Sequence, residues 1–279
     1  MLAHRRLVFG VIAGLALAFS TCSTCSSRRA PIEVATFNIR NFPESEWQSL
    51  GAFAAIAELE VSVVGVQEIG DPATFEIDAA RQLGASWEVE FDANVGSRIR
   101  LGLLFDGERW GLVDKRSHAI GGRADQRPAL EVRLRSRVDA RDLRVFVVHL
   151  KAGGSADDIG LRAAQLGALT PIVREAMASE DEIVVLGDFN ATSLRDRESL
   201  ARFAAQTGAS WASESLECTS YWRPDAECRG SALDHVFTRG PASSIVAAGP
   251  CEQFGCSPGD RCPAFYDWVS DHCPVRARL

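Results

Sequence analysis

Short apolar runs that each end in a polar residue constrain the fold of this chain more than any other feature. The clearest are VVGV before Gln67 and Glu68, VFVV before His149, and IVVLG before Asp188. Aliphatic and β-branched runs of this length favour buried strands. Polar groups carried to one edge of a sheet by several strands form a site. The sequence therefore predicts a strand-rich fold with a polar site where several strands end.

The predicted strands and helices follow a mixed order along the chain. The opening is strand, helix, strand, with Ser45 as the N-cap of the helix. Many strands and few further helices favour two packed sheets flanked by helices. No linker or repeat divides the chain after its first residues, so one domain is expected. Strands are predicted over 32–37, 61–67, 87–91, 98–105, 110–118, 129–134, 143–149, 182–186, 232–238, 245–248 and 270–277, and helices over 45–60, 73–83 and 157–178.

The first 27 residues are typical of an export leader. A basic start, HRR, precedes an apolar stretch over 7–19 and a small polar run. The apolar stretch is short for a membrane span, which favours a signal peptide over a permanent N-terminal anchor. A lipid anchor at Cys22 is the alternative, although FST before this cysteine matches a lipobox poorly. We expect residues 28–279 to be exported as the functional domain, and to be periplasmic, secreted or lipid-anchored at the cell envelope.

Cysteines are concentrated at the end of the chain. Six of the eight lie after residue 217, and an even set in an exported chain predicts disulfides. We expect Cys218 to pair with Cys228, closing a loop, and the other four to pair among themselves. A zinc cluster is the rival interpretation, but the spacing lacks close CxxC pairs. The six are Cys218, Cys228, Cys251, Cys256, Cys262 and Cys273.

Acidic residues outnumber basic ones by 37 to 30. Removal of residues 1–21 takes away two arginines and no acids, which leaves 28 against 37 and a net charge of −9. A surface this acidic does not bind polyanions as a whole. Any contact with nucleic acid must therefore be local and assisted by cations, which disfavours a simple DNA-binding protein and leaves a metal-dependent hydrolase open.

The polar residues at the predicted strand ends are of the types that metal-assisted phosphodiester hydrolysis uses. Carboxylates bind hard cations, and imidazoles transfer protons near neutral pH. Asp188 and Asn190 alone are also typical of a turn. Glu68 needs either a cation or a salt bridge to Arg40 or Arg127. The candidate segments are Asn38, Gln67-Glu68, Val148-His149, Gly187-Asp188-Phe189-Asn190, Leu233-Asp234-His235 and Ser270-Asp271-His272.

The order of these segments resembles the endonuclease/exonuclease/phosphatase superfamily, which includes pancreatic-type deoxyribonuclease. The resemblance extends from about residue 32 to residue 279. HLKAGG, which begins at His149, and RxxQ, which begins at Arg162, are similar to the exported bacterial nuclease branch. The resemblance implies a four-layer α/β sandwich of two mixed sheets packed face to face with helices outside.

The resemblance also implies a metal and a base. Glu68 would bind Mg²⁺, together with Asp271; Mn²⁺ could replace Mg²⁺, and a role for Ca²⁺ is open. His272, oriented by Asp234, would act as general base on the attacking water.

The remaining implied roles concern the phosphate and the leaving oxygen. His149 would stabilise or protonate the leaving oxygen, and Asp188 would position water or metal. Asn38, Asn190 and Arg127 would hold the phosphoryl oxygens.

One departure from the family pattern concerns His149. In the deoxyribonuclease branch an acid on a middle strand orients the first catalytic histidine. The corresponding stretch here, SRIRLGLLF over 97–105, contains no carboxylate. The sequence therefore names no orienting partner for His149.

We expect a Mg²⁺-dependent phosphodiesterase that cleaves nucleic acid, DNA foremost, as an endonuclease with no stable protein partner. The alternative substrate is a phospholipid head group, as in sphingomyelinase-like members, or a small phosphoester. An apolar, aromatic membrane-binding hairpin would favour it. The candidates are YW at 221–222 and FYDW at 265–268, but both lie between cysteines, where they could instead pack against disulfides. A non-enzymatic binding module is the third hypothesis, which the retained polar residues disfavour. Basic residues that could contact a nucleic acid backbone are Arg40, Arg98, Arg100, Lys151, Arg162 and Arg223.

Overall fold

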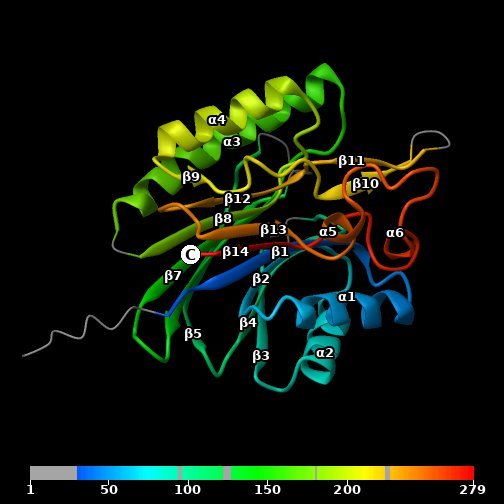
Figure 1. Ribbon diagram of the computed structural model, residues 1–279. Helices are drawn as coiled ribbons and strands as arrows, with labels where there is room; N and C mark the ends of the chain where they lie inside the picture. The colour runs from blue at the N-terminus through cyan, green and yellow to red at the C-terminus, as the bar shows by residue number, and fades with distance from the viewer. Residues whose placement is uncertain (1–29, 94–95, 122–126, 180, 224–226) are drawn as a thin grey trace, which may run out of the picture. The chain divides into compact units, whose positions relative to one another are not determined.

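Two mixed six-stranded sheets dominate the part of the chain that the computed structural model describes, residues 30–93, 96–121, 127–179, 181–223 and 227–279 (Figure 1). The expected leader over 1–27, with Cys22, lies outside these residues. Residues 31–279 form one compact unit.

The first sheet has the order β13-β14-β1-β2-β4-β3. β1 and β2 are parallel neighbours, so their carboxyl ends meet at one edge. The strands are β1 Glu33–Phe42, β2 Val63–Ile69, β3 Trp87–Phe91, β4 Arg100–Asp106, β13 Ser244–Ala247 and β14 Val275–Arg278.

The second sheet has the order β5-β6-β7-β8-β12-β9. β7 and β8 are parallel, and β12 is antiparallel to β8, so the start of β12 lies beside the end of β8. A hairpin of β10 Ser220–Trp222 and β11 Arg229–Ser231 lies outside both sheets. The strands of the second sheet are β5 Trp110–His118, β6 Ala129–Ser136, β7 Asp142–His149, β8 Glu182–Asp188, β9 Ser210–Trp211 and β12 Asp234–Thr238.

Three hydrophobic clusters separate four layers. One cluster joins the inner faces of the two sheets, a second lies between the first sheet and α1 and α2, and a third lies between the second sheet and α3 and α4. This arrangement confirms the predicted four-layer α/β sandwich. The helices are α1 Glu46–Glu58, α2 Pro72–Gln82, α3 Ala156–Met177, α4 Leu194–Thr207, α5 Pro250–Phe254 and α6 Ala264–Trp268.

The helix starts follow from local sequence. Ser45 caps α1 by accepting a hydrogen bond from the Gln48 backbone N–H, as predicted. Ser155 and Asp158 form a reciprocal capping box at the start of α3. α4, α5 and α6 were not among the predicted helices.

The predicted final strand over 270–277 is wrong at its start. β14 begins at Val275, and His272 precedes it, paired only through an isolated bridge to Ser220. The segment around His272 is therefore positioned by the β10 region rather than by a sheet.

The late cysteines form three disulfides, which confirms the predicted use of these residues. The predicted pairing of Cys218 with Cys228 is wrong, because Cys218 pairs with Cys256 and Cys228 with Cys262. Cys251 pairs with Cys273. The β10–β11 hairpin lies against the α5 region, which brings cysteines distant in sequence together.

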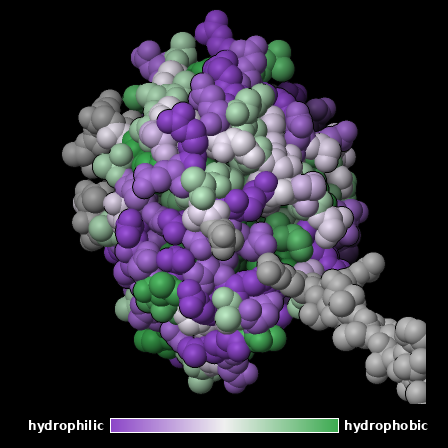
Figure 2. Space-filling model, turned by 90° about the vertical axis from the view of Figure 1, so that its left-hand side faces the viewer, coloured by the Kyte–Doolittle hydropathy of each residue, from purple (hydrophilic) through white to green (hydrophobic). Residues whose placement is uncertain are grey.

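None of the helices within the described ranges is long and apolar enough to cross a membrane. Hydrophilic residues cover most of the face in Figure 2, and hydrophobic residues form only small separate patches there. This agrees with the charged composition of the chain.

Gly65 tests how closely the sheets pack. A Cβ atom on Gly65 of β2 would overlap Leu186 Cδ1 and approach Val147 on the opposite sheet. We expect Gly65→Ala to destabilise the fold by about 1–3 kcal/mol, since an added methyl group must displace packed side chains. Thermal unfolding measures this. The matched control is Gly167→Ala on α3, where a Cβ meets open space and alanine is the better helix former; equal melting temperatures for the two variants would contradict the close packing.

Candidate active site

Three polar side chains form one row across the second sheet. His149 ends β7 and lies opposite Asp188, which ends β8 and lies opposite Asp234 at the start of β12. Side chains two positions away in the same strands belong to the core between the sheets. By alternation, the polar row points into that same space, where the core ends. These core residues are Val147, Leu186 and Val236.

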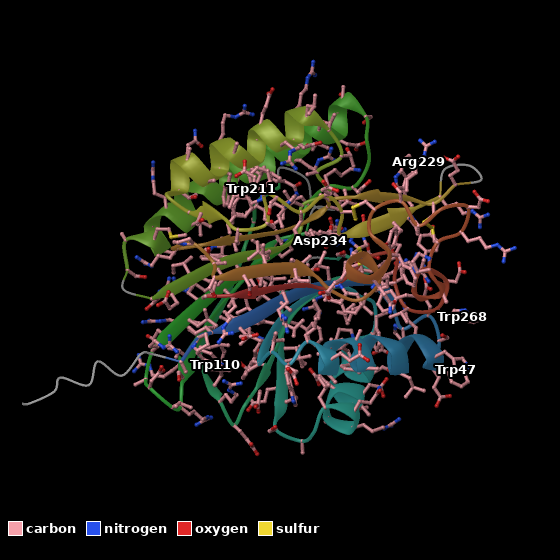
Figure 3. The ribbon with its side chains drawn as sticks, viewed as in Figure 1. Trp47, Trp110, Trp211, Arg229, Asp234 and Trp268 are labelled. Atoms are coloured by element: carbon pink, nitrogen blue, oxygen red, sulfur yellow. A yellow bond between two sulfur atoms is a disulfide. The ribbon has the colours of Figure 1, made fainter. Side chains whose placement is uncertain are left out.

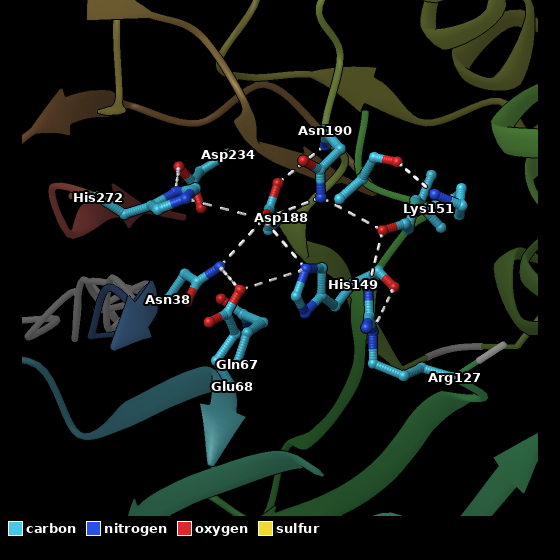
Figure 4. Close-up of polar contacts among 12 residues, drawn as sticks. Asn38, Gln67, Glu68, Arg127, His149, Lys151, Asp188, Asn190, Asp234 and His272 are labelled. Atoms are coloured by element: carbon cyan, nitrogen blue, oxygen red, sulfur yellow. Dashed lines mark hydrogen bonds and ion pairs between the residues drawn. The ribbon is translucent and has the colours of Figure 1, made fainter. Parts of the chain in front are cut away.

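Asn38 joins the first sheet to this row. It lies opposite Gln67 in the parallel pair of β1 and β2 and is fully buried. Its Nδ2 donates to Asp188 Oδ2 at 3.0 Å and lies 3.3 Å from Glu68 Oε1 (Figure 4). One amide therefore connects carboxylates from both sheets. The sequence predicted Asn38 as a site residue, and the structure brings it to the centre of the group.

Glu68 reaches the site through an unusual backbone conformation. Val64 and Val66 of the same strand pack toward α1 and α2, so strict alternation would turn Glu68 away from the site. Its φ of 64° is left-handed, and the Asn41 N–H donates to its Oε2 at 3.0 Å. Its Oε1 lies 3.8 Å from His149 Nε2. Non-glycine residues adopt this φ at a cost of about 1 kcal/mol or more, which is typical of functional positions.

The loop after β8 turns sharply at Gly187. Its φ is 143°, and a Cβ there would overlap the Val148 carbonyl oxygen, so this position requires glycine. Asn190, with φ of 51°, follows. Its backbone N–H donates to Asp188 Oδ1 at 2.8 Å, and its Nδ2 donates to Asp188 Oδ2 at 3.0 Å. Asp188 and Asn190 therefore face the same point, as predicted.

Asp234 and His272 form a hydrogen-bonded dyad. His272 Nδ1 lies 2.7 Å from Asp234 Oδ2, and both residues are buried. The Thr219 hydroxyl donates to the same carboxylate oxygen at 2.8 Å and accepts the Asp234 backbone N–H at 2.8 Å. The other ring nitrogen of His272, Nε2, is turned toward the polar row and lies 3.9 Å from Asp188 Oδ2.

Two supporting hydroxyl groups were not predicted. Thr219 fixes the Asp234 carboxylate, and Ser270 donates to the Asn38 carbonyl at 2.7 Å while accepting the His272 N–H at 3.0 Å. Ser270 stood in a predicted segment without a role. Thr219 follows a cysteine in a segment with no strand or helix pattern, so no sequence signal marked it.

Burial and like charge change the protonation of Asp188. Removal from water, together with the negative charges of Asp234 and Glu68, raises the pKa of Asp188 to about 7, although His272 opposes this. Burial favours the neutral form of His272, but the charges of Asp234 and Asp188 outweigh it and hold the His272 pKa well above its usual range. Without a cation, His272 is therefore protonated at neutral pH, and Asp188 gains or loses its own proton in the same pH range.

His149 has the opposite character. Burial, with the positive charges of Arg127 and His272, holds the His149 pKa well below its usual value, so this imidazole is neutral. Its Nε2 lies 3.4 Å from Asp188 Oδ2. Its Nδ1 is buried and has no hydrogen-bond partner among the described residues. The sequence named no orienting partner for His149, and the structure supplies none there.

Arg127 and Asp271 lie at the border of the site. Arg127 donates to the carbonyls of His149 and Leu150, both at 3.1 Å, and burial lowers its pKa. It therefore secures the end of β7, and neither it nor Arg40 forms an ion pair with Glu68. The carboxylate of Asp271 has no described contact with Glu68; its charge contributes to the raised His272 pKa.

Most of the predicted backbone-binding cations are engaged within the protein. Arg162 is buried and donates to Asp196, Thr192 and the carbonyls of Lys151 and Gly153. It therefore holds the loops after β7 and β8 instead of facing a ligand. The other engaged pairs are Arg40 with Glu44, Arg100 with Asp92, and Lys151 with Asp158.

The donor set fits a hard divalent cation. Asp188, Asp234 and His272 each offer a ligand atom within 4.8 Å of the others. Glu68 Oε1 and Asp188 Oδ2 share the Asn38 amide, and Asp234 Oδ1 is buried without a hydrogen-bond partner. Carboxylates gathered in one buried place repel each other, and a cation bound by oxygen atoms offsets that repulsion.

Comparison with known proteins agrees with this geometry. The chain matches the Endonuclease/Exonuclease/phosphatase family over residues 35–272. No curated protein matches it.

Several solved structures share the fold. The human Nocturnin catalytic domain with bound sulfate has a TM-score of 0.64 at 19% identity, covering 89% of this chain and 93% of that chain. TDP2 of D. rerio, complexed with single-strand DNA product, has a TM-score of 0.66 at 15% identity, with 89% and 98% covered. A family protein from Bacteroides thetaiotaomicron has a TM-score of 0.63 at 14% identity, with 90% and 97% covered.

These likenesses concern the fold, while the sequence match spans every residue of the polar row, the Asn38 bridge and the dyad. The predicted resemblance is confirmed at this level. The chain belongs to the Endonuclease/Exonuclease/phosphatase family.

Proposed function

We propose that this protein hydrolyses phosphodiester bonds in nucleic acid, as an endonuclease that depends on a divalent cation. The observation that carries the proposal is the convergence of the Asp234–His272 dyad on Asp188, with Nε2 of His272 3.9 Å from Asp188 Oδ2. Carboxylates from both sheets and two imidazoles then surround one point: Asp188, Glu68, His149 and His272. Cation-assisted attack of water on a phosphate requires such a group.

Glu68 and Asp188 are the residues that would hold the cation, since Asp234 and His272, which could also offer ligand atoms, are bonded to each other as the dyad; Asp271 remains a predicted further ligand. Oxygen-only ligands and partial exposure of Glu68, at 20% of its side chain, suit Mg²⁺, with Mn²⁺ as a substitute. When bound, the cation neutralises negative charge that develops on the phosphoryl oxygens.

His272 is the proposed general base. A protonated imidazole cannot accept a proton, and the charges of Asp188 and Asp234 keep His272 protonated. A base role therefore requires that the charge of Asp188 be offset, after which Asp234 alone orients the ring through Nδ1 and leaves Nε2 free to accept a proton from water.

The remaining residues act on the phosphate. His149 is neutral and buried, so its ring can donate one hydrogen bond to the leaving oxygen without adding charge. Asn38 and Asn190 point their Nδ2 groups at Asp188, where they can also donate to phosphoryl oxygens. Arg127 would add positive charge from beneath the loop after β7.

Nucleic acid is the proposed substrate, DNA foremost. TDP2 of D. rerio, which shares the fold, was solved with single-strand DNA product. The three disulfides support an oxidising compartment, in agreement with the predicted export of residues 28–279 behind a leader over 1–27. Periplasmic, secreted and Cys22-anchored forms are all compatible with that proposal.

A phospholipid head group is the second candidate substrate. Three exposed tryptophans favour it: Trp47 at 71% and Trp268 at 64%, both labelled in Figure 3, and Trp222 at 48%. Exposed tryptophans are typical of protein surfaces that touch lipid. Tyr221, in contrast, is buried and bonded to the Pro250 and Gly255 carbonyls, so it belongs to the core.

The first prediction concerns the reaction. Protein spanning residues 28–279 should nick supercoiled plasmid in Mg²⁺, and EDTA should abolish nicking, because the gathered carboxylates need a cation to approach a polyanion. Gel electrophoresis of the plasmid measures this. Hydrolysis of sphingomyelin without nicking would move the substrate to the second candidate.

The second prediction concerns His272. His272→Ala should lower kcat by about 10² to 10⁴ while the fold remains, since a positioned general base contributes that much. The matched control is His118→Ala. His118 ends β5, the edge strand of the second sheet, and its imidazole pairs with Glu131 and not with a residue of the proposed site. Near-wild-type turnover in His272→Ala would remove His272 from the mechanism.

The third prediction concerns cation binding and pH. A proton competes with the cation for Asp188, whose pKa is raised to about 7. Mg²⁺ should therefore raise the melting temperature more at about pH 8.5 than at about pH 5.5. At a Mg²⁺ concentration about 100 times its Kd, the stabilisation is about 2.7 kcal/mol, or roughly 5–10 °C for a chain of this size. Glu68→Gln should lose most of the shift at both pH values; a shift that is independent of pH would argue against Asp188 as a ligand.

A further inference from the structure

The dyad is supported by two segments that pair with each other outside both sheets. Residues 218–222 carry Thr219, which holds Asp234, and residues 271–273 carry His272. The amide of Cys273 donates to the Thr219 carbonyl at 2.7 Å, and the amide of Tyr221 donates to the Asp271 carbonyl at 2.7 Å. The position of His272 relative to Asp234 therefore depends on this short pairing.

Both segments are covalently bound to a third one. Cys218, next to Thr219, forms a disulfide with Cys256, and Cys273, next to His272, forms one with Cys251. Cys251 lies in α5 and Cys256 two residues after it. We call residues 250–256 with these two disulfides the α5 clamp, since they join the two segments that carry the dyad.

Besides the disulfides, the burial of Pro250 and Cys251 and a few hydrogen bonds hold the clamp in place. α5 has five residues and no side-chain cap, and a helix this short is unstable alone. The Tyr221 hydroxyl donates to the carbonyls of Pro250 and Gly255, near the two ends of the clamp, and the Gly230 N–H donates to the Cys256 carbonyl at 2.9 Å. On another side, α5 borders an open cavity of about 750 Å³, whose lining includes residues of α1, α6 and β14.

We propose that the α5 clamp positions the Asp234–His272 dyad, so that hydrolysis requires both of its disulfides and stops when they are reduced although the sandwich stays folded. This inference rests on the proposed function and adds a way in which that activity would be regulated. The third disulfide, Cys228–Cys262, binds the far strand of the hairpin to the loop at 259–262 and reaches neither dyad segment directly.

The redox chemistry needs only a dithiol such as dithiothreitol. Each clamp disulfide accepts two electrons and two protons and becomes two thiols, while the dithiol closes to its own disulfide. Cys256 is half-buried, whereas Cys218, Cys251 and Cys273 are buried. Attack at the Cys256 sulfur is therefore the accessible first step, and Cys218 is the leaving thiolate.

The experiment compares two disulfide deletions of nearly equal loop length. Cys218→Ser/Cys256→Ser opens a separation of 38 residues and Cys228→Ser/Cys262→Ser one of 34, so the expected losses of stability are similar. We expect the clamp variant to lose kcat by a factor on the order of 10² with KM nearly unchanged, because a small misplacement of the base has that effect. The control variant should keep wild-type kcat. Equal activities of the two variants would overturn the proposal.

A second readout is independent of substrate. Amide hydrogen exchange at Tyr221 and Cys273 should become faster in the clamp variant, and in wild type after dithiothreitol, while the amides of β7 and β8 stay protected. Unchanged exchange at Tyr221 and Cys273 would overturn the clamp. If exchange at Tyr221 and Cys273 becomes faster but the oxidised wild type cleaves no phosphodiester, the clamp is supported and the proposed function is rejected.

If the clamp variant does not fold, wild-type protein gives the same comparison during reduction. The kcat is then followed against thiol labelling of Cys218 and Cys256, and full activity with both cysteines labelled would overturn the proposal.

Discussion

The Asn38 amide is the contact on which the site depends. Its Nδ2 group contacts Glu68 at the end of a strand in one sheet and Asp188 at the end of a strand in the other. Its position follows from the close packing of the sheets, which Gly65 permits by leaving space for Leu186. The site is therefore a property of sheet packing as much as of its own residues: a change in the distance between the sheets would separate the carboxylates before it disturbed any strand.

Two histidines at one site acquire opposite protonation from their surroundings. Both are buried, which favours the neutral form. For His149 the neighbouring charges include Arg127 and favour the same form, whereas for His272 the carboxylates of Asp234 and Asp188 reverse the outcome. One imidazole can thus act as a neutral donor, and the other changes state when the charge beside it changes.

The sequence predicted what depends on local pattern. Apolar runs that stop at a polar residue placed His149 and Asp188 at strand ends, and the order of such runs indicated the sandwich. It failed where position depends on distant pairing. His272 lies in a loop fixed by β10, and the partner of Cys218 is decided by a hairpin that folds onto α5. Arg162 was among the basic residues expected to contact a nucleic acid backbone, but a buried ion pair with Asp196 engages it.

At position 68 the backbone conformation lowers the stability of the fold, while the proposed reaction uses the carboxylate. The left-handed backbone there is unfavourable for most residues with a Cβ. Asparagine and aspartate tolerate it better, and glycine, which has no Cβ, adopts it without strain. A library selected for thermal resistance alone would therefore drift toward glycine at this position and lose the carboxylate among its earliest changes. Thermostable descendants of this protein would accumulate as intact folds without the proposed cation ligand, and only a screen that includes turnover would keep Glu68.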